Sequence, residues 1–376
     1  MSDSQATTTP AELAAVARAF PLPGRFRGGA PHGSGHINDT FAVTFDQAGT
    51  SVRYILQRIN GRIFRDVPAL MDNIQRVTQH AAGAAAGDDA ARRALTLVPA
   101  RDGQPFHRDE RGAYWRCYLF VERARTYDVI ETPRQAEEAA RAFGEFQRLL
   151  LDLPGPRLRE TIPGFHDTRR RFENFRRALA EDRHGRAEAV REEIAFAYQR
   201  EPLVDVLHEL HACAEMPERI THNDTKLNNV MLDDATQEAV CVIDLDTVMP
   251  GLALHDFGDM VRSATNAAAE DERDLAKVAM RMPIFEALLA GYLSSAGAFL
   301  TAAECAHLAF AGKLITFEIG LRFLTDHLEG DVYFKIRRPG HNLDRVRNQF
   351  ALVRSIERQE STMQAAADRI ARTVCV

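Results

Sequence analysis

Short runs of alternating and β-branched apolar residues fill the first third of the chain. The runs at 39–46 (DTFAVTFD) and 52–59 (VRYILQRI) flank a short polar turn, a pattern typical of a β-hairpin. Two further apolar runs, at 95–100 (LTLVPA) and 114–122 (YWRCYLFVE), predict additional strands. Residues 67–81 carry apolar side chains at helical spacing instead. This region is predicted to form a five-stranded antiparallel sheet with one helix, and the four runs account for four of its strands.

From Glu131 onward the apolar positions follow the period of amphipathic helices. Long helical patterns cover 134–153, 169–183, 191–215 and 352–374. They are interrupted by one polar stretch with short β-rich runs at 219–251. The pattern predicts an α+β protein with two lobes, in which residues 1–121 form the sheet lobe and residues 122–376 form the mainly helical lobe.

The polar stretch contains the sequence HNDTKLNN, which places His222, Asp224, Lys226 and Asn229 in the order and spacing of a kinase catalytic loop. In such a loop the aspartate orients and deprotonates the attacking hydroxyl, and the asparagine supplies a neutral oxygen to magnesium. Asp224 is therefore the candidate catalytic residue, and Asn229 is a candidate metal ligand. Each residue alone is common in turns, but their order, spacing and flanking strands together indicate catalysis.

A buried strand predicted at 239–243 ends at Asp244. A carboxylate at this place suits Mg²⁺, a hard cation that prefers oxygen ligands and can bridge the phosphates of ATP. Asp246 follows two residues later on the same face and is a second candidate ligand. The sequence thus predicts ATP and Mg²⁺ as cofactors.

The tripeptide Asp256-Phe257-Gly258 spells the motif that holds magnesium in protein kinases. In kinases the metal-binding aspartate follows the catalytic loop after one short hairpin, and Asp244 has that context. Asp256 instead follows a Pro-Gly turn and precedes an amphipathic helical pattern. We expect Asp256 to cap that helix and to brace the catalytic loop rather than to bind metal.

A glycine-rich stretch between predicted strands is typical of a loop that covers nucleotide phosphates. Its candidate residues are Gly33, Ser34 and Gly35. Gln57 occupies the strand position where protein kinases place a lysine, so we expect a neutral hydrogen bond to the nucleotide there. The segment 119–122 joins the lobes and is expected to contact adenine, with Phe120 and Glu122 as its candidate residues.

Composition narrows the class of protein. The chain is 45% apolar and 27% charged, as in soluble globular proteins, and none of its apolar runs approaches a membrane span. A net charge of −6 argues against nucleic acid as the main partner. The N-terminus does not read as a secretory signal, and five scattered cysteines without a CxxC pair favour reduced thiols. We expect a cytoplasmic protein, with its oligomeric state left open.

Segments along nearly the whole chain resemble the N-acetylhexosamine 1-kinases, within the aminoglycoside phosphotransferase and choline kinase superfamily. The resemblance rests on GHINDTF, YILQRIN, WRCYLFVERARTYD, HNDTKLNN, IDLDTVMPG, DFGDMVR and FEIGLRFLTDHLEGDVYFK. It implies a two-lobed protein-kinase-like fold. It also implies transfer of the ATP γ-phosphoryl group to the anomeric hydroxyl of N-acetylglucosamine or N-acetylgalactosamine, so that the partner is a small amino sugar.

The resemblance further implies contacts to the sugar beyond Asp224. The matching positions are His36, Ser263, Arg322 and Tyr333. Many relatives carry an aromatic residue at the position of Ser263, which weakens its assignment. Structural alternatives exist for the other three: a surface histidine at 36, an ion pair between Arg322 and Asp326 one helical turn away, and a core tyrosine at 333.

Two other interpretations stay open at this point. The acceptor could be another small hydroxyl compound, such as N-acetylmuramate, homoserine, choline or an aminoglycoside. Choline and aminoglycosides are cationic, and the candidates His36, Arg322 and Tyr333 favour a neutral or anionic acceptor over them. The chain could also be a nucleotide-binding pseudokinase. The missing strand lysine favours this interpretation, and the retained Asp224, Asn229 and Asp244 oppose it.

Overall fold

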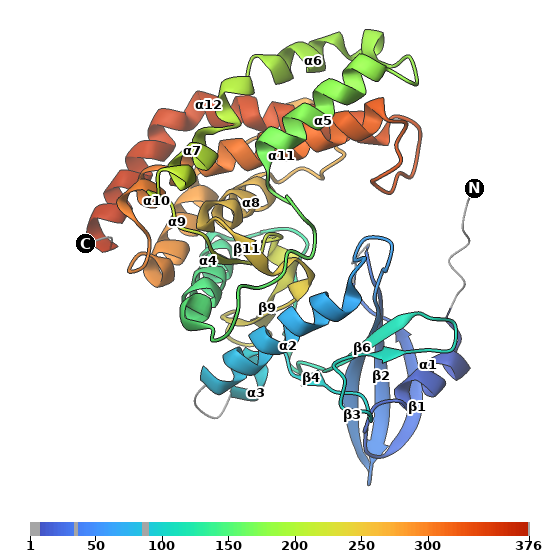
Figure 1. The fold of residues 1–376 in the computed structure, drawn as a ribbon. Helices are drawn as coiled ribbons and strands as arrows, with labels where there is room; N and C mark the ends of the chain where they lie inside the picture. The colour runs from blue at the N-terminus through green and yellow to red at the C-terminus, as the bar shows by residue number, and fades with distance from the viewer. Residues whose placement is uncertain (1–7, 34–36, 85–89, 375–376) are drawn as a thin grey trace. The chain divides into compact units, whose positions relative to one another are not determined.

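The computed structural model of the chain describes residues 8–33, 37–84 and 90–374. The chain divides into two compact units, which are Met1–Ala124 with Leu153–Ile162, and Arg125–Asp152 with Pro163–Val376. The first unit holds an antiparallel sheet and the second is mainly helical (Figure 1), which confirms the predicted fold class.

The first unit is built on a six-stranded sheet with the order β1-β2-β3-β6-β4, in which β5 also pairs with β6. Its elements are α1 (Pro10–Ala17), β1 (Arg25–Pro31), β2 (Asp39–Gln47), β3 (Thr50–Arg58), α2 (Val67–Ala84), α3 (Ala90–Arg93), β4 (Leu97–Val98), β5 (His107–Arg108) and β6 (Tyr114–Leu119). The predicted hairpin is confirmed, because β2 and β3 pair along their whole length. The prediction of five strands was wrong. The β1 sequence RFRGGAP lacks an alternating apolar pattern, so its place at the sheet edge is not visible in the sequence.

Helix α2 confirms the helix predicted at 67–81, and Leu70, Ile74 and Val77 on its apolar face are all buried. The buried Asn73 of α2 binds the segment that follows the first long helix of the other unit. The Asn73 amide donates to the Arg159 carbonyl at 2.7 Å and accepts from the Arg159 N–H at 3.0 Å. These bonds explain why Leu153–Ile162 belongs to the first unit.

The second unit contains most of the helices and two small sheets, with the orders β10-β9-β7 and β11-β8. Its elements, with η for 3₁₀ turns and with β7 (Ala124–Arg125) at the junction of the units, are α4 (Pro133–Leu149), η1 (Leu150–Asp152), α5 (Thr168–Glu181), η2 (Ala187–Val190), α6 (Arg191–Tyr198), η3 (Glu201–Leu203), α7 (Val206–Ala212), β8 (Arg219–Thr221), η4 (Leu227–Asn229), β9 (Val230–Asp233), β10 (Ala239–Val242), η5 (Leu245–Thr247), β11 (Met249–Gly251), α8 (Ala253–Thr265), η6 (Leu275–Lys277), α9 (Met282–Ala296), α10 (Ala302–Ala306), α11 (Leu308–Leu328) and α12 (His341–Val374).

Helices α4, α5 and α12 confirm three of the predicted helices. The single helix predicted at 191–215 was wrong, because that stretch forms α6, η3 and α7. The break coincides with Pro202, which lacks a backbone N–H and disfavours a helical conformation in the residue before it.

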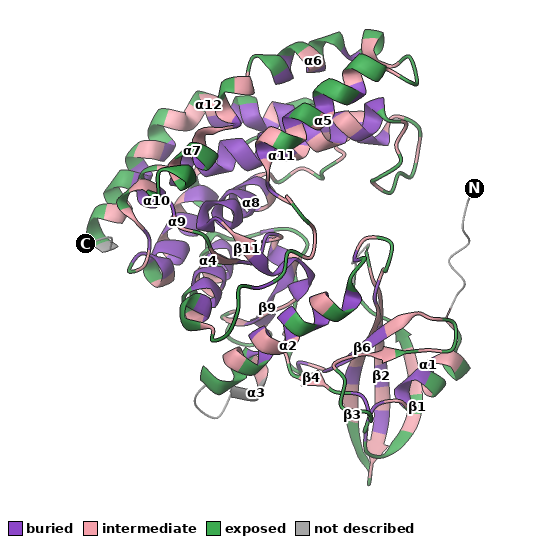
Figure 2. Cartoon of the chain, in the orientation of Figure 1, coloured by how far each residue is buried: buried purple, intermediate pink, exposed green. Residues whose placement is uncertain are grey.

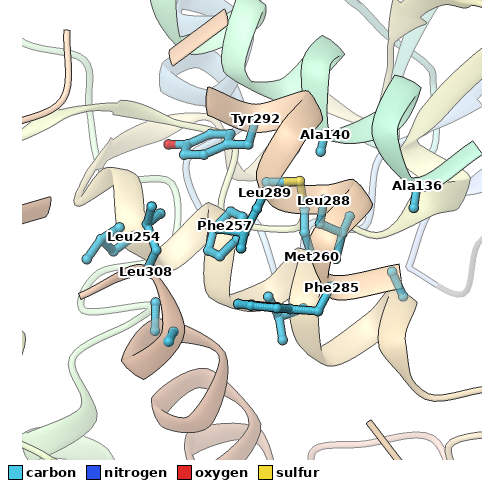
Figure 3. Close-up of a cluster of buried hydrophobic side chains, with 14 of the residues drawn as sticks. Ala136, Ala140, Leu254, Phe257, Met260, Phe285, Leu288, Leu289, Tyr292 and Leu308 are labelled. Atoms are coloured by element: carbon cyan, nitrogen blue, oxygen red, sulfur yellow. The ribbon is translucent and has the colours of Figure 1, made fainter. Parts of the chain in front are cut away.

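The core of the second unit forms where α4, α8 and α9 meet (Figure 3). Phe257 from α8 packs against Phe285 and Tyr292 from α9, with ring centroids 6.3 and 5.1 Å apart. Helix α8 is buried along nearly its whole length (Figure 2). It therefore provides a rigid support for the loops that begin and end near it.

The described part of the chain has neither a membrane-spanning helix nor a disulfide bond. None of its helices is both long enough and apolar enough to cross a bilayer. Cys117, Cys213, Cys241 and Cys305 are free thiols, and Cys375 lies outside the described residues.

Candidate active site

The predicted catalytic loop connects β8 to η4, and its first turn depends on Asn223. This residue has a φ of 64°, a left-handed conformation that asparagine tolerates better than most residues. Its side chain donates to the Thr247 carbonyl at 2.9 Å and accepts from the Thr221 hydroxyl at 3.0 Å. The turn is thus held in place immediately before Asp224.

Asp224 lies between a cation and an amide. The Lys226 ammonium is 2.8 Å from Asp224 Oδ1, and the Asn229 amide donates to the Asp224 carbonyl at 2.7 Å. Burial raises the pKa of Asp224, but the neighbouring Lys226 charge outweighs this effect, so the net pKa lies below its usual value. The carboxylate is therefore ionised and oriented at neutral pH, ready to accept a hydrogen bond from a hydroxyl group.

Two of the candidate metal ligands flank a pair of neighbouring strands: Asn229 ends η4 directly before β9, and Asp244 follows the end of β10. Strands β9 and β10 pair so that Val230 is opposite Val242, and the Ile243 N–H donates to the Asn229 carbonyl at 2.9 Å. Asp244 follows directly, is exposed, and has a φ of 60°. A non-glycine residue in this conformation is uncommon, and such residues cluster at functional sites.

Asn229 and Asp244 offer oxygen atoms, the kind of ligand that magnesium prefers. The Asp224 carbonyl only accepts hydrogen bonds, so the Asn229 amide must turn its nitrogen toward it and its oxygen away. Within the described ranges, no cluster of three or more His, Cys, Asp or Glu residues is arranged to hold a metal. Magnesium needs no such cage, because it commonly binds one or two carboxylates together with substrate phosphates. Asp246 is only 3% exposed, and its role as a ligand stays a prediction.

Asp256 does not cap α8, and that prediction was wrong. The helix begins at Ala253, so Asp256 lies inside its first turn, and Leu252 at the N-cap makes no side-chain bond. The carboxylate of Asp256 instead accepts from the backbone N–H groups of His222 and Asn223 at 2.9 and 2.6 Å. This confirms that Asp256 braces the catalytic loop. It is fully buried, which explains why it is not available to a metal.

His222 links the catalytic loop to the strand that precedes Asp244. Its Nε2 donates to the Ile243 carbonyl at 2.9 Å, and its Nδ1 accepts from the Asp224 N–H at 3.3 Å. The ring packs against Phe143 and Phe146 of α4 with centroids 5.3 and 5.9 Å apart. These contacts hold the two carboxylate-bearing segments in one arrangement.

A second buried support, around His166, was missed in the sequence. His166 Nε2 donates to the Asn223 carbonyl at 3.1 Å, and its Nδ1 is 2.8 Å from Glu318 on α11. The Thr168 hydroxyl donates to the other oxygen of Glu318 at 2.5 Å. No local pattern marks these residues, because Glu318 is 152 positions from His166 along the chain.

Arg322 and Tyr333, both proposed from the resemblance, lie near each other. The Arg322 guanidinium is 5.9 Å from the Tyr333 ring centroid and 5.1 Å from that of Phe165. Tyr333 is 56% exposed, so the alternative of a core tyrosine was wrong. Asp326 accepts three backbone N–H groups and, among the described residues, forms no ion pair with Arg322. That alternative was therefore wrong as well.

The other two sugar-binding candidates are less informative. His36 lies outside the described residues. Ser263 donates its hydroxyl to the Asp259 carbonyl at 2.8 Å within α8, so its role stays a prediction.

Asp259 itself was not considered in the sequence. Its carboxylate is 3% exposed and pairs with Arg262 at 2.7 Å, and its second oxygen has no hydrogen-bond partner in the described part of the chain.

Some of the residues predicted to bind a nucleotide lie close together in the first unit. Gly33 has a φ of 78° with open space at its Cβ position, whereas Ser34 and Gly35 lie outside the described residues. The ring of His32, directly before this glycine, is 5.4 Å from the ring of Phe120. The start of the glycine-rich loop therefore lies beside the segment 119–122.

Arg53 contacts Phe120 and Glu122, the two candidate residues of the segment 119–122. Its guanidinium lies 3.8 Å from the Phe120 ring centroid, and its Nε donates to Glu122 at 2.9 Å. All three residues line a hollow of about 270 Å³.

Gln57 is held from two sides within the sheet. Its Oε1 accepts from Arg116 at 2.9 Å and its Nε2 donates to Thr40 at 2.9 Å. Arginine only donates, so the Gln57 amide must present its oxygen to Arg116 and its NH₂ group to Thr40. Its contact with a nucleotide stays a prediction.

Comparison with known proteins gives matches along most of the chain. Residues 28–296 match the model of the phosphotransferase enzyme family. The fold is similar to that of an aminoglycoside phosphotransferase from Alicyclobacillus acidocaldarius, with a TM-score of 0.57 and 12% identity over 98% of each chain. It is also similar to a choline kinase from Cryptosporidium parvum, with a TM-score of 0.52 and 12% identity over 97% of each chain.

A third similar structure is a spectinomycin phosphotransferase solved in complex with ADP and spectinomycin. Its TM-score is 0.55 at 14% identity, over 93% of this chain and 99% of that chain. At these identities the three structures indicate a shared fold.

Proposed function

We propose that this chain, which belongs to the phosphotransferase enzyme family, transfers the γ-phosphoryl group of ATP to the anomeric hydroxyl of an N-acetylhexosamine. The family makes it a small-molecule phosphotransferase, and the named acceptor is our addition. The observation that carries the proposal is the catalytic loop, in which Asp224 is ionised and oriented next to Lys226 and Asn229.

In this mechanism Asp224 orients the acceptor hydroxyl and takes its proton. The anomeric hydroxyl is more acidic than the other sugar hydroxyls, because the ring oxygen withdraws electron density. An aspartate with a lowered pKa is a weak base, and it suits a reaction in which orientation contributes more than basicity. The Lys226 ammonium, 2.8 Å from Asp224, adds positive charge where phosphoryl oxygens would approach.

Each unit, taken by itself, supplies candidate residues for the nucleotide. Asn229 and Asp244 would hold Mg²⁺, which when bound neutralises negative charge on the transferring phosphates. In the first unit, the loop at Gly33 would cover the phosphates, and the Gln57 amide would donate a neutral hydrogen bond. The hollow beside Phe120 and Glu122 is our candidate for the adenine contact.

The acceptor would lie near Arg322 and Tyr333. A guanidinium offers five donors in a planar fork, which suits sugar hydroxyls and an N-acetyl carbonyl. An exposed tyrosine next to it supplies a flat apolar face for a sugar ring. The positive charge of Arg322 disfavours the cationic choline and aminoglycosides, although proteins named for such acceptors share the fold.

The proposal is tested by measuring ADP release with a panel of acceptors: N-acetylglucosamine, N-acetylgalactosamine, glucose, homoserine, choline and kanamycin. We expect turnover with the N-acetylhexosamines and a loss of about 10²- to 10⁴-fold in Asp224→Asn. Asp368→Asn, on the exposed face of α12, is the matched control and should keep full activity. Turnover with choline or kanamycin alone would refute the acceptor, and ATP binding without any turnover would favour a pseudokinase.

A further inference from the structure

A hollow of about 170 Å³ lies in the second unit between α5 and the C-terminal end of α11. Three arginines line it: Arg171 and Arg177 from α5, and Arg322 from α11. The aromatic rings of Tyr333 and Phe334 complete its wall. Pockets that enclose a whole small molecule run to about 300–1,000 Å³, so this hollow suits one substituent of a ligand.

The three arginines form no ion pair and no hydrogen bond with an acid in the part of the chain that the structure describes, although the charge of the buried Glu318 carboxylate acts on Arg171 and Arg322. Arg171 donates to the Phe165 carbonyl and Arg177 to the Asn174 side chain, each at 2.9 Å, and neither forms an ion pair there. The Arg322 guanidinium lies over the rings of Phe165, Tyr333 and Phe334 and has no hydrogen bond or ion pair among the described residues. Nearby arginines of the same unit behave differently. Arg169 is paired with Asp205, and Arg186 with Asp331.

The acids at the hollow do not balance this positive charge. Asp326 Oδ1 accepts the N–H groups of Val332 and Tyr333 at 2.9 and 2.7 Å. Its Oδ2 accepts from Phe334 at 2.9 Å and from Asn342 at 2.8 Å. Burial and the neighbouring Asp326 carboxylate raise the pKa of Glu329, and the charge of Arg177 opposes this shift without reversing it.

The arginines also repel one another. Burial, followed by the charge of Arg322, lowers the pKa of Arg171. The Arg171 Nε is buried without a hydrogen-bond partner among the described residues. A bound anion would relieve the repulsion and supply the missing acceptor, and two guanidinium forks are well suited to a carboxylate or phosphate group.

The hollow lies beside the catalytic loop. Phe165 contacts the arginines, through its carbonyl to Arg171 and through its ring to Arg322. The next residue, His166, donates to the carbonyl of Asn223, which directly precedes Asp224. Two consecutive residues, Phe165 and His166, therefore connect the hollow to the loop that carries Asp224.

We propose that this hollow is an anion subsite of the acceptor, so that the preferred sugar carries a carboxylate or phosphate substituent that binds Arg171 and Arg322. This inference rests on the proposed function and narrows its substrate class. Neutral N-acetylhexosamines would leave the subsite unfilled and would bind more weakly. Arg177 would contribute from the rim of the hollow.

The first test compares the KM values of three acceptors in the wild-type protein. N-acetylmuramic acid carries a carboxylate, N-acetylglucosamine 6-phosphate carries a phosphate, and N-acetylglucosamine is neutral. We expect one of the charged acceptors to have a KM at least about tenfold below that of the neutral one. Which one does so identifies the source of the anion. A neutral acceptor that binds as well as both charged ones would overturn the proposal.

The second test removes the charge of the subsite. Arg171→Gln should raise the ratio of the charged-acceptor KM to the neutral-acceptor KM by about tenfold. Arg176→Gln, on the same helix but paired with Glu173 and Glu201, is the matched control and should leave the ratio unchanged. If Arg171→Gln unfolds, Arg177→Gln takes its place. An unchanged ratio in a folded variant would overturn the proposal.

Failure of the proposed function gives a different result. If no acceptor is turned over, titration calorimetry of N-acetylmuramic acid and N-acetylglucosamine 6-phosphate into the intact protein still tests the subsite. Binding of either compound that is lost in Arg171→Gln but kept in Arg176→Gln would support the anion subsite without the kinase activity. Absence of binding by both compounds would overturn it.

Discussion

The tripeptide Asp256-Phe257-Gly258 has a structural role here, whereas the same three residues bind magnesium in protein kinases. Asp256 holds two backbone N–H groups of the catalytic loop, and the Gln147 amide donates to it at 2.7 Å. Phe257 is fully buried in the core of the second unit. The tripeptide is therefore a bracing and packing motif in this protein.

Asp256→Asn should destabilise both the fold and the loop. An asparagine would turn an NH₂ group toward a backbone N–H, so at least one buried donor would lose its acceptor. We expect the free energy of unfolding to fall by about 1–3 kcal/mol, and kcat to fall because the turn before Asp224 loosens. Denaturant unfolding and steady-state kinetics measure the two effects, with Asp368→Asn as the control. A variant with wild-type kcat would contradict the bracing role.

At the scale of elements, helices α8 and α11 approach each other closely at Gly258. A Cβ atom at this position would lie 2.5 Å from the Ala311 carbonyl oxygen and 2.6 Å from a side-chain carbon of Ile315. Backbone at that distance cannot move without shifting a helix. The contact fixes α8, which carries Asp256, against α11, which carries Glu318 and Arg322.

Gly258→Ala should therefore lower the free energy of unfolding by about 1–3 kcal/mol, as overpacking does in other cores. Gly83→Ala is the matched control, because Gly83 is also helical and has no atom within 4 Å of its Cβ position. The control should be neutral or should stabilise by up to about 1 kcal/mol. Equal effects of the two substitutions in chemical denaturation would show that the close contact is absent.

The link between α11 and the catalytic loop should depend on pH through His166. Burial lowers the pKa of His166, but the Glu318 charge more than offsets this, so the net pKa is raised above 6.5. The folded state then binds this proton more strongly than the unfolded state. The contribution to stability is fully present below about pH 6.5 and is lost as the pH rises through the folded value.

Glu318 gives the opposite dependence at acidic pH. Burial raises its pKa, but the positive charge of His166 and its hydrogen bonds lower it to about 2. Its contribution is present above its ordinary value of 4.5 and is lost as the pH falls toward 2. Unfolding curves of the wild type, His166→Asn, Glu318→Gln and the double variant across this pH range measure both effects. Additive losses at every pH would mean that the pair is not coupled.

At the scale of the whole molecule, nucleotide binding should stabilise the folded chain. A ligand at 100 times its Kd adds about 2.7 kcal/mol to the free energy of unfolding. Asp224 is assigned to the acceptor, so Mg-ATP should raise the unfolding temperature of Asp224→Asn as much as that of the wild type. A rise that is absent in both proteins would contradict nucleotide binding, and one absent only in the variant would contradict the role given to Asp224.

Features encoded in short stretches of sequence were predictable. The β2–β3 hairpin, helix α2 and the strand that delivers Asp244 follow from local apolar patterns. The spacing from Asp224 to Asn229 predicts that the two residues lie close together, and one turn and one 3₁₀ helix hold them so; their catalytic role stays a prediction.

Features that depend on distant contacts were not predictable. The partners of Asp256 in the catalytic loop are 33 and 34 positions away, and His166 meets Glu318 across 152 positions. Asp256 looked like a helix cap, because a short polar residue near a helix start normally binds the helix itself. Leu153–Ile162 belongs to the first unit and is hydrogen-bonded to α2, and such contacts leave no pattern in the segment itself.

The central claim is that the phosphoryl group reaches the anomeric oxygen of an N-acetylated amino sugar. Phosphorus NMR of the product made from ATP, Mg²⁺ and N-acetylglucosamine or its carboxylated analogue tests it most directly. We predict one new phosphate ester whose signal couples to the anomeric proton and which is absent with Asp224→Asn. A phosphate ester that couples to any other sugar proton would contradict the claim.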